Sequence, residues 1–314
     1  MSSNPQDTMI RFDIVKNRRK FYFLSAVILI LGLVFTLILG LDLGVDFKAG
    51  TRLDLYIGKE FNVGDIETVL HKEVPDVKFK DVTKTGDKNL WATTTFDQPI
   101  PKDKLEAIQA ELKQKYGDQV ERQESTVDPI IADEMVKKAV IALVLASIGI
   151  AVYIAFRFQY LFGIACIVSL VHDAFIPIAM FSIFRIEVDL TFVAAILTIV
   201  GYSINDTIVI FDRIRENLRT MKVKTVEDLE HIVNVSLWQT MRRSIFTVFT
   251  VFVAALSIAI FGSEGIRNFS LALIFGLVSG TYSSIFIAAQ VWVTLKKREM
   301  GKKRLKPAAN PNQS

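Results

Sequence analysis

Long apolar runs separated by polar stretches dominate the pattern along this chain. Six of these runs are close to the roughly 20 residues that a helix needs to cross a bilayer. They cover residues 21–40, 139–156, 161–184, 190–211, 244–261 and 269–295. The first has a long apolar core with no clear cleavage site after it, so we expect an uncleaved span and not a signal peptide. The pattern predicts a polytopic α-helical membrane protein with six transmembrane helices.

Basic residues concentrate before the first run, between the second and third, in residues 212–243 and after the last run. With six spans these segments all lie on one side, which the positive-inside rule makes cytoplasmic. We therefore expect a cytoplasmic N-terminus at 1–20, a cytoplasmic loop at 212–243 and a cytoplasmic basic tail at 296–314. Within the loop, Thr225 to Asp228 resembles a capping box that starts an amphipathic helix. Topology thus explains the basic residues, and no nucleic-acid partner is expected.

The long segment 41–138 falls on the other side and has the pattern of a folded domain. Residues 51–57 and 76–82 alternate as half-buried strands do, and residues 89–95 are rich in strand-forming types. Residues 63–74 are apolar at helical spacing, and Pro101 opens a second helix that ends at Gly117. Residues 119–127 form a last strand. The order β-α-β-β-α-β predicts an α+β ferredoxin-like extracytoplasmic domain, which we expect to bind or dock and not to catalyse.

The composition limits the kinds of functional site that the chain can contain. Hydrophobic residues make up 51% of the chain, and Cys166 is the single cysteine, so an internal disulfide and a Cys-based zinc site are excluded. The three histidines, His71, His172 and His231, lie in different segments. The sequence has no glycine-rich phosphate loop, nucleophile elbow or HExxH pattern. We expect no metal, no cofactor and no enzymatic activity.

An Asn–Asp pair, Asn205 and Asp206, interrupts the apolar run at 190–211. A charged side chain at the bilayer centre costs about 2.5–3.5 kcal/mol on insertion scales, so it normally faces the bundle interior and has a partner. The alternative is that Asp206 lies at the wet cytoplasmic boundary, because the basic cluster begins nearby at Arg213. The cost of burying a charge favours the functional, buried position.

Two further polar groups lie near these spans. His172 and Asp173 sit halfway along the third run, and Pro177 removes the helical donor to the Asp173 carbonyl. They are either a proton-relay or gating element, or a pair that satisfies itself and fixes helix packing. Arg242 and Arg243 precede the fifth run. They anchor the topology, or one of them reaches Asp206 if the fourth and fifth spans are antiparallel neighbours.

Four stretches resemble the SecD/SecF family of protein-export membrane proteins, which is related to the resistance-nodulation-division transporters. They are GVDFKAGT after the first span, VHDAF in the third, GYSINDTIVIFDRIREN in the fourth and NVSLWQTMRRSIFT before the fifth. With the six-span layout, the resemblance covers nearly the whole chain. The first stretch departs from the family pattern, because Lys48 and Ala49 stand where the family usually has Thr and Gly.

The resemblance implies an auxiliary subunit of the Sec protein translocase in the bacterial plasma membrane. Such a subunit works with SecD and uses the proton motive force to promote preprotein export through the SecYEG channel; SecA and YajC are further candidate partners. The runner-up is a stand-alone proton-coupled exporter of small or lipid-like substrates from the related transporter superfamily. A purely structural anchor is a third class, and it would need no charge in the fourth span.

The resemblance also assigns residues. It makes Asp206 the essential acid of the fourth span and Arg243 its charge partner. Candidates for a relay or gate are His172, Asp173 and Asn205, and candidates for a hinge motif below the outer domain are Asp46, Phe47 and Gly50. Desolvation favours the neutral form of a carboxyl group and a nearby arginine favours the charged form. A buried acid of this kind can therefore bind and release a proton as its access to water changes.

Overall fold

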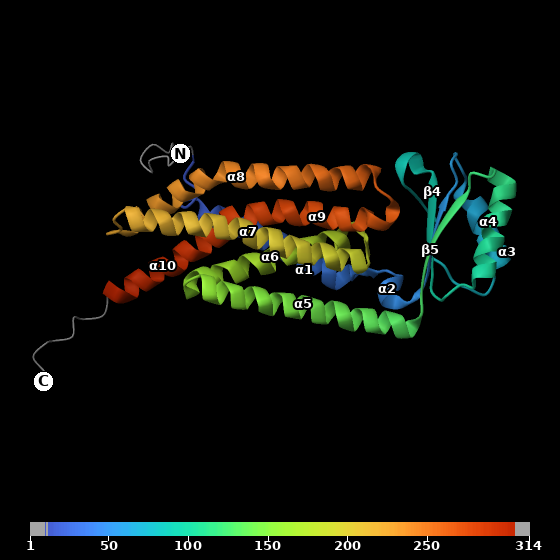
Figure 1. Ribbon diagram of the computed structural model, residues 1–314, viewed down its shortest axis with the longest axis horizontal. Helices are drawn as coiled ribbons and strands as arrows, with labels where there is room; N and C mark the ends of the chain where they lie inside the picture. The colour runs from blue at the N-terminus through green and yellow to red at the C-terminus, as the bar shows by residue number, and fades with distance from the viewer. Residues whose placement is uncertain (1–9, 11, 305–314) are drawn as a thin grey trace, which may run out of the picture.

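The computed structural model describes residue 10 and residues 12–304, and it has two parts (Figure 1). Long helices form a bundle, and a smaller α+β module stands at one end of it. Helices α3 (Val63–Glu73) and α4 (Lys102–Tyr116) lie on the side of the module's sheet that faces away from the bundle. Half of the predicted N-terminal segment 1–20, namely residues 1–9 and 11, and the last residues of the predicted tail, 305–314, lie outside the described residues.

Six helices in the described part of the chain are long and apolar enough to cross a membrane, as the hydrophobic pattern predicts. None of the most apolar window of the second is buried within the chain, which suits a helix that faces lipid. The helices are α1 (Arg18–Leu39), α5 (Pro129–Arg157), α6 (Tyr160–Phe184), α7 (Leu190–Thr220), α8 (Val226–Phe261), and a last one made of α9 (Glu264–Ser283), a π-helical segment (Ser284–Ala288) and α10 (Ala289–Arg304).

Several helix boundaries differ from the sequence expectations. Helix α5 begins at Pro129, so residues 129–138 belong to the bundle and not to the α+β module. Proline starts this helix readily, because the first turn has no partner for its missing N–H. The predicted loop 212–243 is mostly helix, since α7 and α8 both continue into it, and α10 likewise extends into the predicted tail.

The short connection between α7 and α8 depends on the predicted capping box. The Thr225 hydroxyl accepts a hydrogen bond from the Asp228 amide at 3.1 Å, and the Asp228 carboxylate accepts one from the Thr225 amide at 2.9 Å. Two amides that the first helical turn leaves unpaired are thereby satisfied. The predicted amphipathic helix continues into the fifth span, and the two form one helix of 36 residues. Its length is about 54 Å.

The α+β module contains the predicted elements in the predicted order. Its strands are β2 (Gly50–Tyr56), β3 (Thr83–Thr85), β4 (Trp91–Phe96) and β5 (Glu121–Val127). They form a sheet in the order β3-β4-β2-β5, with every neighbouring pair antiparallel. Leu53 and Leu55 of β2 are fully buried against Ile66 of α3 and Ile108 of α4. One face of the sheet is therefore closed by the two helices.

The strand expected at residues 76–82 is displaced to β3. In that segment the structure has an isolated bridge between Phe79 and Phe96, and the Lys80 amide reaches the Thr95 carbonyl. The Lys80 carbonyl accepts from the Thr94 hydroxyl at 2.6 Å, which replaces a backbone donor. This side-chain bond interrupts a regular ladder. The alternating pattern therefore reflected burial of side chains without continuous strand pairing.

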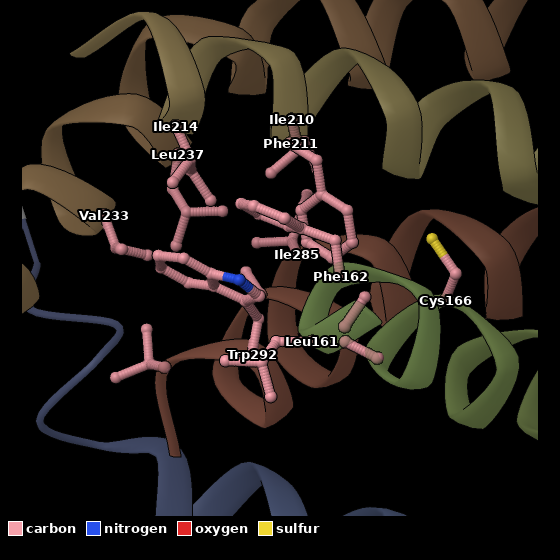
Figure 2. Close-up of a cluster of buried hydrophobic side chains, with 14 of the residues drawn as sticks. Leu161, Phe162, Cys166, Ile210, Phe211, Ile214, Val233, Leu237, Ile285 and Trp292 are labelled. Carbon is pink, nitrogen blue, oxygen red and sulfur yellow. The ribbon is translucent and has the colours of Figure 1, made fainter. Parts of the chain in front are cut away.

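A separate apolar core holds the other end of the bundle together, where α6, α7, α8, the π-helical segment and α10 meet (Figure 2). The rings of Phe162 and Trp292 stack with centroids 4.6 Å apart and 13° between their planes. The Phe211 ring lies 4.8 Å from that of Phe162. Close van der Waals packing of such side chains holds membrane helices together. This core fixes the helix ends farthest from the module.

The chain turns sharply where it passes from the bundle into β2. After β1 (Asp42–Leu43) and α2 (Val45–Lys48), Ala49 adopts φ 66° and ψ 169°, a region of the backbone map that is essentially reserved for glycine. Gly50 follows with φ 121°, and a Cβ there would collide with the Phe96 carbonyl oxygen. The turn is therefore made despite the departure from the family pattern, with conformational strain at Ala49.

We expect Ala49→Gly to stabilise the protein. Relief of strain is worth about 1–3 kcal/mol, whereas the greater freedom of glycine in the unfolded chain costs about 0.5–1 kcal/mol. The measurement is thermal unfolding of the purified full chain in detergent. Ala110→Gly, at an exposed position within α4, is the control and should lower Tm, because glycine costs about 1 kcal/mol inside a helix. Two variants with the same fall in Tm would show that Ala49 is not strained.

Candidate functional site

Helix α7 carries Asp206 into the interior of the bundle. The helix runs unbroken through this position, and its neighbours Ser203 and Thr207 are buried on the same side. Asp206 is half-buried, and its Oδ2 atom is inaccessible to solvent. Asn205 lies on the exposed side of the helix, so the structure does not bring this relay candidate into the site. Of the two readings of Asp206, burial within packed helices agrees with this geometry.

The two carboxylate oxygens of Asp206 have different surroundings. Oδ1 accepts a hydrogen bond from the Ser244 hydroxyl of α8 at 2.5 Å. Oδ2 is buried, and no donor among the described residues reaches it. A buried polar atom without a partner is costly, because it has lost water and gained nothing in exchange. The group is thus only half satisfied by the protein, which suits a carboxyl that takes up and releases a proton.

The expected contact between Asp206 and Arg243 is indirect. Ser244, the next residue, occupies the position beside Asp206, and no ion pair of the described side chains joins Asp206 to either arginine. Successive helical residues point about 100° apart, so Ser244 and Arg243 cannot both face α7 squarely. Arg243 is exposed, yet it lies near enough for its charge to act on Asp206. Arg242 instead places its guanidinium 5.7 Å from the ring centre of Phe246.

Asp173 of α6 is fully buried and is surrounded by donors. Its Oδ1 accepts from the Ser279 hydroxyl at 2.9 Å and lies 3.0 Å from Nδ1 of His172. Its Oδ2 accepts from the hydroxyls of Ser203 and Ser283, both at 2.5 Å. We call these five residues the Asp173 cage. Because Ser203 belongs to α7 and the other serines to α9, the cage joins three helices.

His172 and Asp173 are thus a self-satisfying pair within a larger network. The imidazole of His172 is buried and stacks on Tyr282 of α9 with ring centroids 6.1 Å apart. Helix α6 continues through Pro177 to its end at Phe184. The contacts support the packing role directly, and they leave the relay role open.

The serines of the cage were missed by sequence reasoning. A signal was available, because Ser279 and Ser283 are four residues apart in an apolar span and so share one helix face. In the adjoining π-helical segment, Ser284 is also buried and its hydroxyl lies 2.8 Å from that of Thr207. π-helical turns occur frequently at functional sites. Consecutive serines at the start of this turn thus both reach polar groups in the core.

Two glycines on α9 let the helix approach α7 closely. A Cβ at Gly276 would overlap Ile199, and one at Gly280 would lie 3.4 Å from the Cβ of Ser203. These distances agree with the role of small residues in letting helices pack closely. Close packing is what allows the short serine side chains of α9 to reach Asp173 across the helix interface.

A junction between the bundle and the module contains the predicted hinge residues. Asp46 of α2 accepts a hydrogen bond at 2.9 Å from the backbone amide of Leu190, the first residue of α7. Beside it, β1 pairs in parallel with β6 (Glu187–Val188). Phe47 packs partly buried against the core of the bundle, and Gly50 makes the turn into β2. The helix that carries Asp206 is therefore bound directly to the hinge motif.

Glu187 is a half-buried acid of this junction. Arg52 of β2 approaches it to 3.8 Å, and Asn268 of α9 donates to its backbone carbonyl at 3.0 Å. Burial raises the pKa of Glu187 above its ordinary value, while the charges of Arg52 and Lys80 partly oppose this shift. Lys80 also pairs with Asp42 of β1 at 2.7 Å. The module and both β1 and β6 are thus held together by charged groups.

Comparison with known proteins gives consistent matches. A family model described as "Protein export membrane protein SecD/SecF, C-terminal" matches residues 107–298. A protein translocase subunit SecF from Alicyclobacillus acidocaldarius is 44% identical over 93% of this chain and 95% of its own length. A protein translocase subunit SecDF from Bacillus subtilis is 40% identical over 96% of this chain, which spans only 40% of that longer protein.

A solved structure of a related protein has a similar fold. The crystal structure of SecDF, a translocon-associated membrane protein from Thermus thermophilus, superposes with a TM-score of 0.79 and 28% sequence identity. The match covers 92% of this chain and 39% of the SecDF chain. The chain therefore corresponds to about two fifths of each of these SecDF proteins and to nearly all of the SecF relative.

We expect Glu187→Gln to change how stability depends on pH. An acid whose pKa is raised in the folded state favours folding as pH falls through that raised value and opposes folding above it. The variant lacks this penalty, so it should exceed the wild type in Tm most at pH 7–8, and the difference should shrink toward pH ~4, near the ordinary pKa. Glu121→Gln, at an exposed position of β5, is the control. A difference that stays constant with pH would contradict the expectation.

Proposed function

The chain belongs to the SecD/SecF family of protein-export membrane proteins, and we propose that it is the SecF-type auxiliary subunit that uses an ion gradient to promote preprotein export. The observation that carries this proposal is the buried, half-satisfied carboxyl of Asp206 in a membrane-spanning helix. The relatives are named as translocase subunits, which are transport components and not enzymes in the bond-making sense. The coupling ion that we propose is the proton.

The partners follow from the family. Because the chain matches almost the whole of a SecF relative but two fifths of the SecDF relatives, we propose that a SecD-type protein supplies the remainder. The complex would act at the SecYEG channel, with SecA and YajC as further candidates and an emerging preprotein as the substrate. The alternative, a stand-alone exporter of small or lipid-like substrates, is not favoured, since the relatives carry translocase names.

The six apolar helices and the relatives indicate a multi-pass protein of the bacterial membrane. We propose that both termini are cytoplasmic. The start of α1 and the end of α10 lie at the end of the bundle farthest from the module (Figure 1). Arg18, Arg19 and Lys20 begin α1, and basic residues also end α10, which agrees with the positive-inside rule.

We further propose that the α+β module is a ferredoxin-like domain on the extracytoplasmic side. Its β-α-β-β-α-β order and its sheet order β3-β4-β2-β5 support this class. The sheet stands between α3 and α4 on one side and the end of the bundle on the other (Figure 1). The module would contact emerging polypeptide or the outer domain of the SecD-type partner.

In the proposed mechanism, proton binding changes the contact between α7 and α8. The ionised Asp206 accepts a hydrogen bond from the Ser244 hydroxyl, and the positive charge of Arg243 stabilises its negative charge. Protonation removes the negative charge, so both interactions weaken and the two helices can shift relative to each other. A proton crossing 100 mV releases about 2.3 kcal/mol. Several cycles are therefore needed to move one long polypeptide.

The junction supplies a route from Asp206 to the module. Asp46 holds the first amide of α7, and β1 pairs with β6 immediately before that helix. A displacement of α7 along its axis would pull directly on α2 and on the strained turn at Ala49 and Gly50. We propose that this linkage converts proton uptake in the bundle into movement of the outer module.

Asp206→Asn should abolish gradient-dependent export. Asparagine keeps the shape and much of the hydrogen bonding but cannot bind a proton reversibly, and it lowers the cost of membrane insertion. We expect normal accumulation in the membrane, no stimulation by an imposed proton gradient, and continued ATP-driven export. The assay is preprotein translocation at matched protein levels with and without the gradient. A variant that still responds fully to the gradient would return Asp206 to a purely structural role.

The arginines provide a matched pair for the same assay. Arg243→Ala should reduce the gradient response strongly, because the charge that acts on Asp206 is lost. Arg242→Ala should be milder, since that side chain lies against Phe246. Equal losses in the two variants would argue that the arginines act only as topology anchors.

Asp46→Ala should uncouple the module from the bundle. It removes the acceptor for the Leu190 amide, and losing a capping contact of this kind costs about 1 kcal/mol. We expect normal insertion and a reduced gradient stimulation of export. Asp46→Asn, which keeps an acceptor oxygen, should retain more activity, and Asp118→Ala, at an exposed position between α4 and β5, serves as the control. An Asp46→Ala protein with full stimulation would exclude this route.

A further inference from the structure

A small void lies between α7, α8 and α9, directly beside Asp206. Its volume is about 10 Å³, which is close to the space that a single water molecule needs. Polar lining comes from Ser203, Asp206, Tyr202 and Thr281, and the rest of the wall includes Gly280. A site of this size and polarity suits one water molecule, which typically makes about three hydrogen bonds when buried.

Asp206 and Ser203 both line the void. Asp206 has one buried carboxylate oxygen, Oδ2, which no described donor reaches. Ser203 lines the same void and already donates its hydroxyl proton to Oδ2 of Asp173 at 2.5 Å. Its oxygen still has accepting capacity, because a hydroxyl carries one proton and two lone pairs. One water could therefore donate to both Asp206 and Ser203.

We propose that this void is a water site that connects Asp206 to Asp173 through Ser203, and that Asp173 is a second proton-binding group. The inference rests on the proposed function, because it extends the path of the proton beyond Asp206. It assigns to the Asp173 cage a chemical role in addition to joining three helices. The ligand of the new site is water, and the species transferred through it is the proton.

The transfer balances as a series of proton hops. The carboxylic acid of Asp206 gives its proton to the water, and the water gives one of its own to the Ser203 oxygen. The Ser203 hydroxyl releases its original proton to Oδ2 of Asp173. The net result is an ionised Asp206, a protonated Asp173, and water and serine unchanged. One negative charge has moved from Asp173 on α6 to Asp206 on α7.

The charged and titratable groups around this path are few in the described part of the chain. Asp173 faces His172 of its own helix, and α9 contributes Tyr282, which stacks on that histidine. Helix α8 contributes Arg243, whose charge acts on Asp206 from the other side. A negative charge on Asp206 is therefore within range of the charge of Arg243, whereas one on Asp173 depends on hydroxyls and on the imidazole.

The test compares two serines that donate to the same atom. Ser203 and Ser283 are both buried and both donate to Oδ2 of Asp173 at 2.5 Å, but of the two only Ser203 lines the void. Ser203→Ala should slow gradient-dependent export about tenfold or more, because positioned proton-transfer groups contribute at least this much. Ser283→Ala should have a smaller effect. Equal losses in the two variants would overturn the proposal and leave a structural cage.

A second variant tests the water directly. Gly280→Ala keeps every hydroxyl and carboxyl group and adds a methyl group at the wall of the void, 3.4 Å from the Cβ of Ser203. It should reduce the gradient response as Ser203→Ala does. Gly265→Ala, a glycine near the start of α9 with open space around its Cβ position, is the control. A full response in Gly280→Ala would exclude water in the void as the link.

Infrared spectroscopy separates this inference from the proposed function. In the purified full chain in lipid vesicles, pH titration of the protonated carboxyl bands should reveal two buried groups. One should disappear in Asp206→Asn and the other in Asp173→Asn, and each substitution should shift the titration of the remaining group. If only the Asp206 band titrates, the second proton site is refuted while the proposed function stands. If neither band titrates, the proposed function fails as well.

Discussion

The structure depends on one constraint: a polar group inside a bilayer must find its partners within the protein, because the hydrocarbon offers none. The bundle buries two carboxyl groups under this constraint. Asp173 has donors on both oxygens, whereas Asp206 has one on Oδ1 and none on Oδ2. The small residues of α9, including Gly276 and Gly280, help to meet this requirement. Longer side chains there would hold the helices too far apart for the serine hydroxyls to reach Asp173.

The two acids differ in how many contacts hold them and in which helices they join. The Asp173 cage holds α6, α7 and α9 with four short contacts to one carboxylate. Asp206 faces the other way, toward α8, and has a single hydroxyl partner there. Removing or restoring its charge therefore alters mainly the α7–α8 contact. We propose that a proton on Asp206 changes the relation of α7 and α8 while the interface of α7 with α9 stays in place.

Much of the fold was accessible from sequence, and the site only in part. Apolar runs predict helices well because the bilayer demands about 20 such residues, but they do not mark where a helix stops outside the apolar region, so α7 and α8 were predicted too short. Asp206 was found because a charge in an apolar run is costly. The contact of Asp206 with Ser244 was not predicted, because the rotation of α8 about its axis decides whether Ser244 or Arg243 faces α7. Serine is common in transmembrane helices, so the serines of the Asp173 cage did not stand out in the sequence.

The unbroken length of α7 turns this local chemistry into mechanics. From Leu190 to Asp206 the helix extends about 24 Å, without an internal proline or a π-helical turn. Its first amide is held by Asp46, next to the paired strands β1 and β6. A stiff helix transmits an axial shift with little loss, and in the proposed mechanism a change at Asp206 would therefore reach the junction as a displacement. There Ala49 already holds a strained conformation, so the turn that leads into the module is where such a displacement most readily changes the backbone.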